Sequence, residues 1–342
     1  MHSTQLARRP DTASHTLIQR FCVGPADIGM VGIVDGATLM EWIHKAGRAV
    51  AAQWSGRHCV TAHIGNLHLD RPIGAGELID LHASVVYTGH TSIHVLVTVY
   101  SHDPMRRKTL QTTQCPIVFV SVDDDGTPVD VEPWRPVTIL DLQRQRQARV
   151  RIQMRKRIDA AMAAQTYSAE GTAPHATGRF LAVGTNVTDG DRIHGGRVLR
   201  WIEEAACGCG AEWIGGTAIT SYVAGVRFHR PVKVSAVVEV TARVVHTGPR
   251  SVHISVHVIT IGTDGGHAQS AAHGLVVVVS LDERGNARPV PTWEPLSDED
   301  HRLDQHARHL IELRQFIEPS TMAAELPAFT EPAPLHPDAI AV

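Results

Sequence analysis

The stretch Asp191-Arg-Ile-His-Gly-Gly-Arg-Val-Leu-Arg-Trp-Ile-Glu-Glu-Ala-Ala206 has a counterpart 159 positions earlier, Gly32-Ile-Val-Asp-Gly-Ala-Thr-Leu-Met-Glu-Trp-Ile-His-Lys-Ala-Gly47. The same offset of 159 recurs at matched residues from Phe21 to Pro136 of the first copy. A constant offset over this span indicates two copies of one folding unit with almost no net insertion between them. Duplicated units commonly pack as a pseudo-dimer, so a site at their seam draws unlike residues from the two halves.

Each copy predicts a short strand, a glycine-rich loop, a helix and then four strands. In the first copy the helix has apolar residues at helical spacing and many small side chains, which predicts a central, buried helix. The expected elements of the first copy are a strand at 16–23, a helix at 37–54 and strands at 59–69, 78–88, 92–101 and 109–122. Those of the second copy are a strand at 178–183, a helix at 196–213 and strands at 217–228, 237–246, 251–261 and 268–281.

This order predicts an α+β fold in which an antiparallel sheet wraps around one helix in each copy. A further helix follows each copy, at 139–164 and at 297–316. The first of these carries a run of arginines without interleaved aromatic residues, which favours a solvated linking helix over a nucleic-acid or membrane site. The expected domains are 1–138 and 176–296, with a helix and linker at 139–175 and a helix and mobile tail at 297–342.

Composition narrows the possible functions further. The net charge of −3 gives no reason to expect nucleic acid as a partner. No apolar run approaches the roughly 20 residues of a membrane span, and Arg8 and Arg9 are not followed by the apolar stretch of a secretory signal. The five cysteines lack a paired spacing, which predicts reduced thiols and a cytoplasmic protein.

The glycine pair Gly195–Gly196 opens the second helix, and Glu203 follows about two turns later. The first N–H groups of a helix lack internal partners, so this end could stabilise a developing oxyanion. A carboxylate on a mostly apolar helix should have a raised pKa and could act as a general base. The plainer alternatives are an ordinary helix start and an acid at the rim that faces water.

These motifs resemble the signature of acyl-CoA thioesterases of the hotdog superfamily, and in particular the cytosolic acyl-CoA hydrolase type with two hotdogs in one chain. The resemblance covers about residues 16–138 and 175–296, and it depends on the joint order of weak motifs that occur twice. The later motifs are Asp70-Arg-Pro-Ile73, Phe228-His-Arg-Pro-Val232, Gly89-His-Thr-Ser92 and Gly248-Pro-Arg-Ser251, with strand ends at Asp125–Gly126 and Arg284–Gly285.

The resemblance implies a double hotdog that binds a thioester at the seam and hydrolyses it without a resident cofactor or metal. A helix N-terminal amide from one half would polarise the carbonyl, and an acid from the other half would activate water or attack the carbonyl directly, with help from an Asn in the preceding loop. It also implies acyl-CoA as substrate and a homo-oligomer such as a trimer of double hotdogs, while the composition gives no reason to expect a membrane or nucleic-acid partner.

The copies depart from the signature in different places, which predicts two unlike pockets. In the first copy the signature Asn is replaced by Gly29, the His by Asp35, the second glycine by Ala37 and the acid by His44. Crossed pairing places Asp35 and the Gly36 amide with Glu203. The other pocket combines His194, Gly195, Gly196 and an out-of-register Asn186 with His44. We favour the first pocket, because a carboxylate is the base of the family; Asp35 could instead be an N-cap, and His44 a packed core histidine.

Further candidates concern coenzyme A. Guanidinium groups match phosphate oxygens, so Arg71, Arg230 and Arg250 are candidates for the phosphates, although all three could be plain surface residues. Candidates for the pantetheine arm are Thr91, Ser92 and Ser251. Two alternatives to hydrolysis remain open: a non-catalytic acyl-CoA-binding protein, and a hotdog enoyl-CoA hydratase, for which Asp189 and His194 have the spacing but Asp191 and Arg192 occupy the Asn and Pro places.

Overall fold

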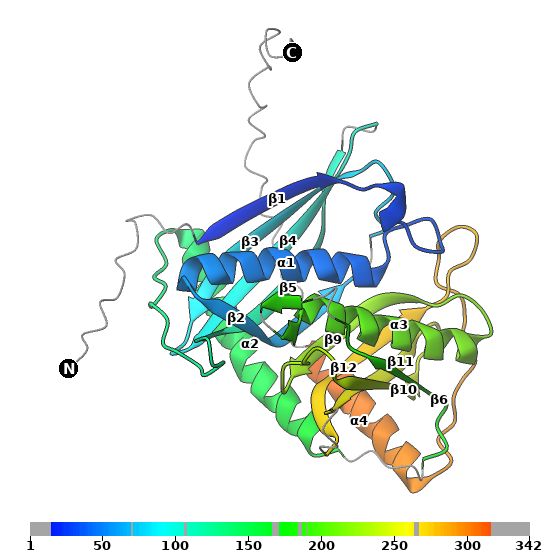
Figure 1. Cartoon of the computed structure of the whole chain (residues 1–342). Coiled ribbons are helices and arrows are strands. Elements are labelled where there is room, and N and C mark those ends of the chain that lie inside the picture. The colour runs from blue at the N-terminus through cyan, green and yellow to red at the C-terminus, as the bar shows by residue number, and fades with distance from the viewer. Residues whose placement is uncertain are drawn as a thin grey trace.

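The computed structural model describes residues 15–69, 71–105, 108–165, 171–183, 187–189, 191–262 and 267–315. The tail predicted from residue 318 onward, and Asn186, lie outside these residues. The described chain shows the predicted duplication: a strand, a helix and four strands, twice over (Figure 1).

The first copy follows the order that the sequence predicts. Its elements are β1 (Thr16–Cys22), the 3-10 turn η1 (Pro25–Asp27), α1 (Gly36–Ser55), β2 (His58–His68), β3 (Leu78–Thr88), β4 (Ser92–Asp103) and β5 (Lys108–Val122), followed by α2 (Ile139–Ala163). The second copy comprises β6 (His175–Leu181), the short strands β7 (Val187–Asp189) and β8 (Arg192–Ile193), α3 (Gly195–Ile214), β9 (Ile219–Phe228), β10 (Val237–Thr247), β11 (Val252–Ile261) and β12 (Gln269–Val279), followed by α4 (Asp298–Gln315).

Each central helix begins and ends at equivalent positions. The Asp35 side chain caps α1 by accepting a 2.6 Å hydrogen bond from the Thr38 N–H, and the His194 ring caps α3 by accepting one of 3.1 Å from the Gly196 N–H. Both helices end at a glycine in the left-handed region, Gly56 with φ of 65° and Gly215 with φ of 69°. A residue with a Cβ would be strained at either position, so glycine terminates both helices at the same point of the repeat.

The strands of both copies form one antiparallel sheet rather than the two separate sheets that the sequence predicts. Its order is β1-β3-β4-β5-β2-β9-β12-β11-β10-β6 among the described residues. The copies meet where β2 pairs with β9, for example His63 opposite Arg227. Strand β6 begins at His175, the last residue of the range 139–175 expected as helix and linker and three residues before the strand expected at 178–183.

The sheet is covered on both faces. Alternating residues separate the two faces, since Val85 packs in the main core with α1 whereas the next residue, Val86, packs with Ala148 of α2. In the second half, α3 lies in the main core and Leu303 of α4 packs on the other face. The predicted close packing of α1 is confirmed: Ala46 is fully buried, and a Cβ at Gly47 would lie 3.0 Å from Ile117 Cδ1.

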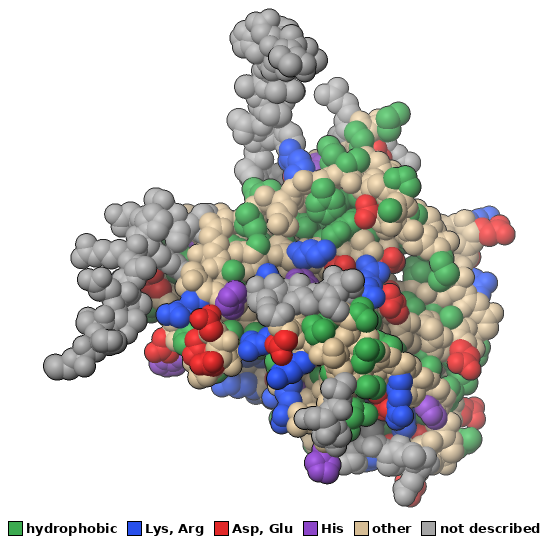
Figure 2. All heavy atoms as spheres, viewed as in Figure 1, with side chains coloured by type: hydrophobic (Ala, Val, Ile, Leu, Met, Phe, Trp, Pro, Cys, Tyr) green, Lys and Arg blue, Asp and Glu red, His purple; other side chains and the backbone are tan. Residues whose placement is uncertain are grey.

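The outer surface differs in one respect from the prediction. The basic helix α2 was expected to be solvated, but Arg151 and Arg155 are half-buried against the sheet, and burial lowers the pKa of both. Acidic and basic side chains lie interspersed over the face seen in Figure 2. Among the described helices, none is both long enough and apolar enough to cross a membrane.

Candidate active site

The two central helices α1 and α3 pack against each other at the seam between the copies. Arg200 of α3 donates a 2.8 Å hydrogen bond from Nε to Glu41 Oε1 of α1, and its Nη2 lies 3.0 Å from Thr38 Oγ1. Glu41 and Arg200 are equivalent residues of the two copies, 159 positions apart. A residue meets its own equivalent only at a two-fold axis, so the pseudo-symmetry axis passes between these two side chains.

On one side of this axis the structure brings Glu203 to the N-terminus of α1. A Cβ built on Gly36 would lie 3.0 Å from Glu203 Oε1 and 3.2 Å from the Cβ of Thr220. The carboxylate is 6% exposed. We call Asp35, Gly36, Glu203 and Thr220 the Glu203 pocket. Only a glycine allows a carboxylate of α3 to approach the first turn of α1 so closely.

The Glu203 carboxylate is held through one oxygen. Oε1 accepts a 2.9 Å hydrogen bond from the Thr220 hydroxyl and a 3.4 Å one from the Cys207 thiol. Both side-chain hydrogen bonds that the described residues make to the Glu203 carboxylate reach Oε1. Burial raises the pKa of Glu203, and the negative charges of Asp35 and Glu204 add to the rise, while the two hydrogen bonds oppose it. A carboxyl group with a raised pKa is a better proton acceptor near neutral pH.

On the other side of the axis the structure brings His44 of α1 to the N-terminus of α3. A Cβ built on Gly195 would lie 2.6 Å from His44 Nε2, and Nε2 lies 2.6 Å from the Thr61 hydroxyl oxygen. The His44 and His194 rings meet edge to face with centroids 4.5 Å apart. We call His44, Thr61, His194 and Gly195 the His44 pocket. The fold therefore brings Glu203 to the Gly36 turn and His44 to the Gly195 turn, while Asn186 of the second expected pocket lies outside the described residues.

His44 is more deeply enclosed than Glu203. Its side chain is 1% exposed, and its Nδ1 has no hydrogen-bond partner among the described residues. Burial lowers the pKa of His44 well below its ordinary value, and the nearby His194, Arg48 and Lys45 lower it further. The imidazole is therefore neutral at physiological pH.

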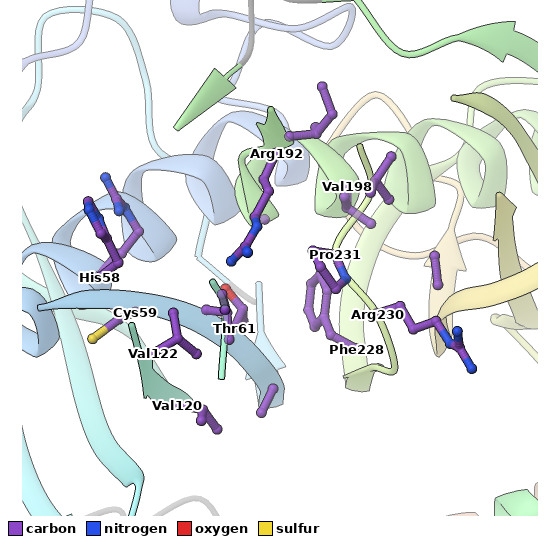
Figure 3. A pocket seen from close by; sticks show the side chains of 18 of the residues that line it. His58, Cys59, Thr61, Val120, Val122, Arg192, Val198, Phe228, Arg230 and Pro231 are labelled. Carbon is purple, nitrogen blue, oxygen red and sulfur yellow. The ribbon is translucent and has the colours of Figure 1, made fainter. Parts of the chain in front are cut away.

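A cavity of about 500 Å³ opens onto the His44 pocket. Its lining includes His44, Thr61, Gly195 and Val198 at the seam, and Arg192 of β8. Figure 3 shows the Arg192 side chain between the β2 wall with Thr61 and the wall formed by Phe228 and Pro231, whereas Arg230 extends away from this space. Glu203, the base that we favour from the sequence, does not line this cavity.

The remaining candidates lie in several places. Of the residues proposed for coenzyme A, Arg230 lines the cavity, and its Nη1 donates to Gln269 Oε1 at 2.8 Å. The exposed Arg71 donates to the Gln111 carbonyl at 3.0 Å. The other candidates do not line this cavity: Arg250, Thr91, Ser92 and Ser251 lie at the turns that join β3 to β4 and β10 to β11. In the described part of the chain, no cluster of three or more His, Cys, Asp or Glu side chains could hold a metal ion.

Three residues at the seam were missed by the sequence analysis: Thr61, Thr220 and Cys207. The two threonines follow His44 and Glu203 by the same 17 positions and are themselves 159 apart. This repeated spacing could have identified both threonines as equivalent residues from the sequence. The role of Cys207 had no such signal, because its equivalent in the first copy is Arg48.

Comparisons with known proteins agree with this architecture. A family model described as the thioesterase superfamily matches residues 31–108 and again residues 190–265. The cytosolic acyl coenzyme A thioester hydrolase of Mus musculus is 22% identical over 91% of this chain and 84% of its own length. The protein VdlD of Helicobacter pylori is 27% identical over 46% of this chain and 90% of its own length. The solved structure of a protein assigned as an oleoyl thioesterase from Lactobacillus plantarum covers 80% of this chain and 99% of its own, with a TM-score of 0.53 and 11% identity, which concerns the fold alone.

Proposed function

We propose that this chain, whose two halves both match the thioesterase superfamily and form a double hotdog, hydrolyses acyl-CoA thioesters to free acid and coenzyme A. The observation that carries the proposal is the contact at the seam, where the buried Glu203 carboxylate of one half abuts the Gly36 turn of the other. The named relatives that extend over most of the chain are acyl-CoA hydrolases, and this supports the same substrate class here.

In the proposed reaction Glu203 acts as the general base. A water molecule at Oε2 gives a proton to the carboxylate and attacks the thioester carbonyl carbon. The negative charge that develops on the carbonyl oxygen is stabilised by the first backbone N–H groups of α1, where the helix dipole is positive. When the carbon–sulfur bond breaks, the coenzyme A thiolate leaves and takes the proton from Glu203, so that acid, thiol and free enzyme result.

The proposal assigns the other pocket residues to supporting roles. The Thr220 hydroxyl orients the carboxylate by binding Oε1, and Asp35 helps to keep the pKa of Glu203 raised while it caps α1. Arg71 is the pseudo-symmetric equivalent of Arg230, which lines the opposite cavity. The Arg230 side chain extends away from that cavity, so we assign Arg71 to the coenzyme A phosphates only on its exposed guanidinium in the Arg-Pro turn.

Assembly into a homo-oligomer is part of the proposal. Large apolar side chains are exposed along the first half of α2, with Ile139 77% exposed and Val150 60% exposed. Such side chains on a helix surface favour burial against another copy. Light scattering after size-exclusion chromatography tests this: a monomer mass of 37 kDa would contradict it, and a multiple of that mass would support it.

The test of function is the release of free thiol from a panel of acyl-CoA esters of different chain length. Wild-type protein should release coenzyme A, and Glu203→Gln should abolish nearly all of this activity. If both proteins bind coenzyme A esters and neither hydrolyses them, the chain is a non-catalytic acyl-CoA-binding protein. The matched control is Glu212→Gln, which changes an exposed acid near the C-terminal end of the same helix.

A further inference from the structure

Each copy carries a small hairpin between its first long strand and its central helix. The first hairpin comprises residues 28–34, and the second is formed by β7 and β8. Both are anchored by a hydrogen bond from N–H to carbonyl at equivalent positions, Val34 to Ile73 at 2.9 Å and Ile193 to Val232 at 2.8 Å. Because these anchors are 159 positions apart, equivalent hairpin residues occupy equivalent places beside the two pockets.

The first hairpin packs directly on the Glu203 pocket. The Gly29 N–H donates a 2.8 Å hydrogen bond to the Ile33 carbonyl and so closes the hairpin. A Cβ built on Gly29 would lie 3.1 Å from the Cβ of Asp35, which is a tight contact. A longer side chain at residue 29 would push the hairpin away from Asp35. The hairpin therefore forms a wall of the Glu203 pocket.

The two hairpins differ in charge where they face their pockets. Arg192 of the second hairpin lines the cavity of the His44 pocket, and Figure 3 shows its side chain inside that space. The equivalent residue of the first hairpin is Ile33, which is half-buried. Another arginine that lines the cavity, Arg48, has Cys207 as its equivalent. The Glu203 pocket thus has uncharged side chains at two places where the other pocket has cations.

The exchange of arginine for isoleucine also changes the space beside the hairpin. A Cβ built on Gly126, in the turn after β5, would overlap the Arg192 guanidinium, so the arginine reaches this turn. A Cβ built on Gly285, in the equivalent turn after β12, would meet no atom of the described residues within 4 Å. Both glycines have positive φ, 85° and 80°, so the two turns share one backbone form. The shorter Ile33 therefore leaves a gap that Arg192 bridges on the other side.

The surroundings of this gap are apolar. A Cβ built on Gly36 would lie 3.1 Å from Leu69 Cδ1, so Leu69 stands beside the glycine turn of the pocket. The tip of the first hairpin exposes large apolar side chains, with Met30 92% exposed and Val31 41% exposed. Aliphatic side chains at a pocket mouth favour contact with a hydrocarbon and disfavour an unpaired charge.

We propose that the first hairpin is the acyl-chain wall of the Glu203 pocket, and that Ile33 selects a long, uncharged acyl chain. The inference rests on the proposed function, because it names the class of acyl group that the same pocket takes. From the thioester at Gly36 the chain passes Leu69 and Ile33 and leaves between the hairpin and the Gly285 turn. The phosphates of coenzyme A stay in water near Arg71.

The decisive variant is Ile33→Arg, which gives the first hairpin the cation that the second already carries. Wild-type kcat/KM should be higher for lauroyl-CoA than for acetyl-CoA, and higher than for the monothioester of dodecanedioic acid, whose chain ends in a carboxylate. In Ile33→Arg the ratio of kcat/KM for lauroyl-CoA to that for acetyl-CoA should fall about tenfold or more. Ile33→Leu keeps an aliphatic side chain and should keep the wild-type ratio.

The matched control is Arg192→Ile, which makes the reverse exchange in the second hairpin and should leave this ratio within about twofold of wild type. Circular dichroism checks that all variants fold. The inference is overturned if Ile33→Arg keeps the wild-type ratio, if Arg192→Ile loses it equally, or if wild-type protein prefers acetyl-CoA or the carboxylate-ended chain.

Binding separates this inference from the proposed function. The probes are S-dodecyl-coenzyme A and S-ethyl-coenzyme A, thioethers that a thioesterase does not cleave, and calorimetry gives their Kd values. Ile33→Arg should lose about tenfold or more of the preference for the dodecyl probe. A chain that hydrolyses acyl-CoA with no dependence on Ile33 loses only this inference. A chain that binds the dodecyl probe through Ile33 and hydrolyses nothing loses only the proposed function.

Discussion

The Glu203 pocket and the His44 pocket are built from equivalent residues of a duplicated unit, yet they differ in charge. Thr220 and Thr61 occupy the same place and hold the central side chain in the same way, at 2.9 Å in one pocket and 2.6 Å in the other. Around this shared frame, one pocket carries Asp35 and Glu203, and the other carries histidines with Lys45 and Arg48 nearby. The backbone of the seam has been kept while the side chains of its two ends have diverged.

The comparison shows what joining two copies in one chain makes possible. In a symmetric homodimer, a residue at the two-fold axis meets an identical residue, so Glu would meet Glu or Arg would meet Arg. Here Glu41 meets Arg200, and the two make a direct ion pair. Because the two copies differ, opposite charges meet at the axis in place of like charges. The two pockets can likewise carry different side chains and take separate roles.

Removing the two central side chains tests the comparison with the largest expected effect. Glu203→Gln should lower kcat/KM for an acyl-CoA ester about 10²- to 10⁴-fold, the range for loss of a general base. His44→Gln should change it less than about threefold, because His44 is not the base of the reaction in our proposal. Steady-state thiol release measures both. A larger loss in His44→Gln than in Glu203→Gln would reverse the assignment of the pockets.

Reversing the charge of Glu41 tests whether the stability of the seam between α1 and α3 depends on the ion pair that the two unlike copies form. Glu41→Arg places two guanidinium groups opposite each other in a half-buried setting. This should cost about 2 kcal/mol of unfolding free energy, between the values for exposed and buried pairs. Thermal denaturation should show a Tm lowered by several degrees, and Glu41→Arg combined with Arg200→Glu should regain most of it. Additive losses in the double variant would contradict the role of the pair.

The matched threonines give an intermediate effect. Thr220→Val removes a hydrogen bond to the Glu203 carboxylate, and such bonds to charged groups contribute about 1.5 kcal/mol or more. The pKa of Glu203 should rise further, and kcat at pH 7 should fall about tenfold. Thr61→Val should leave kcat near the wild-type value. Circular dichroism of both variants serves as the control for folding, and equal effects on kcat would remove the functional distinction between the pockets.

The smallest expected effect concerns pH. Burial and then Asp35 raise the pKa of Glu203, so the rising limb of kcat against pH lies above the ordinary carboxyl range. Asp35→Asn removes a negative charge, lowers the pKa of Glu203 and should shift this limb to lower pH by less than about one unit. Asparagine caps a helix as well as aspartate does, so α1 should keep its N-terminus. A shift to higher pH would contradict the assignment.

Much of the candidate site was predictable because the repeat itself carries spatial information. The offset of 159 pairs Gly36 with Gly195 and His44 with Glu203, and the packing of duplicates then crosses these pairs at the seam. The repeat marks Thr61 and Thr220 as equivalent, but it does not show that their hydroxyls contact His44 and Glu203, because those contacts form only when the helix packs against the strand. The position of the large cavity was also beyond prediction, since it depends on Phe228, Arg192 and β2 meeting from three separate segments.

By itself the sequence determined the duplicated unit, the order of its strands and helices, and the two glycine turns with an acid and an imidazole at matched positions. Local periodicity and a constant offset suffice for these features, because each depends on neighbours within one element or on a comparison of two copies. The tertiary structure alone decided that β2 and β9 join the strands into one sheet and that a cavity opens at His44. It also decided that Thr220 binds Oε1 of Glu203, and that Thr61 binds Nε2 of His44 while the buried Nδ1 has no partner among the described residues. Burial and hydrogen bonding at the seam arise between segments some 150 residues apart, and the free energy of desolvating a side chain is set by what packs around it rather than by its place in the chain.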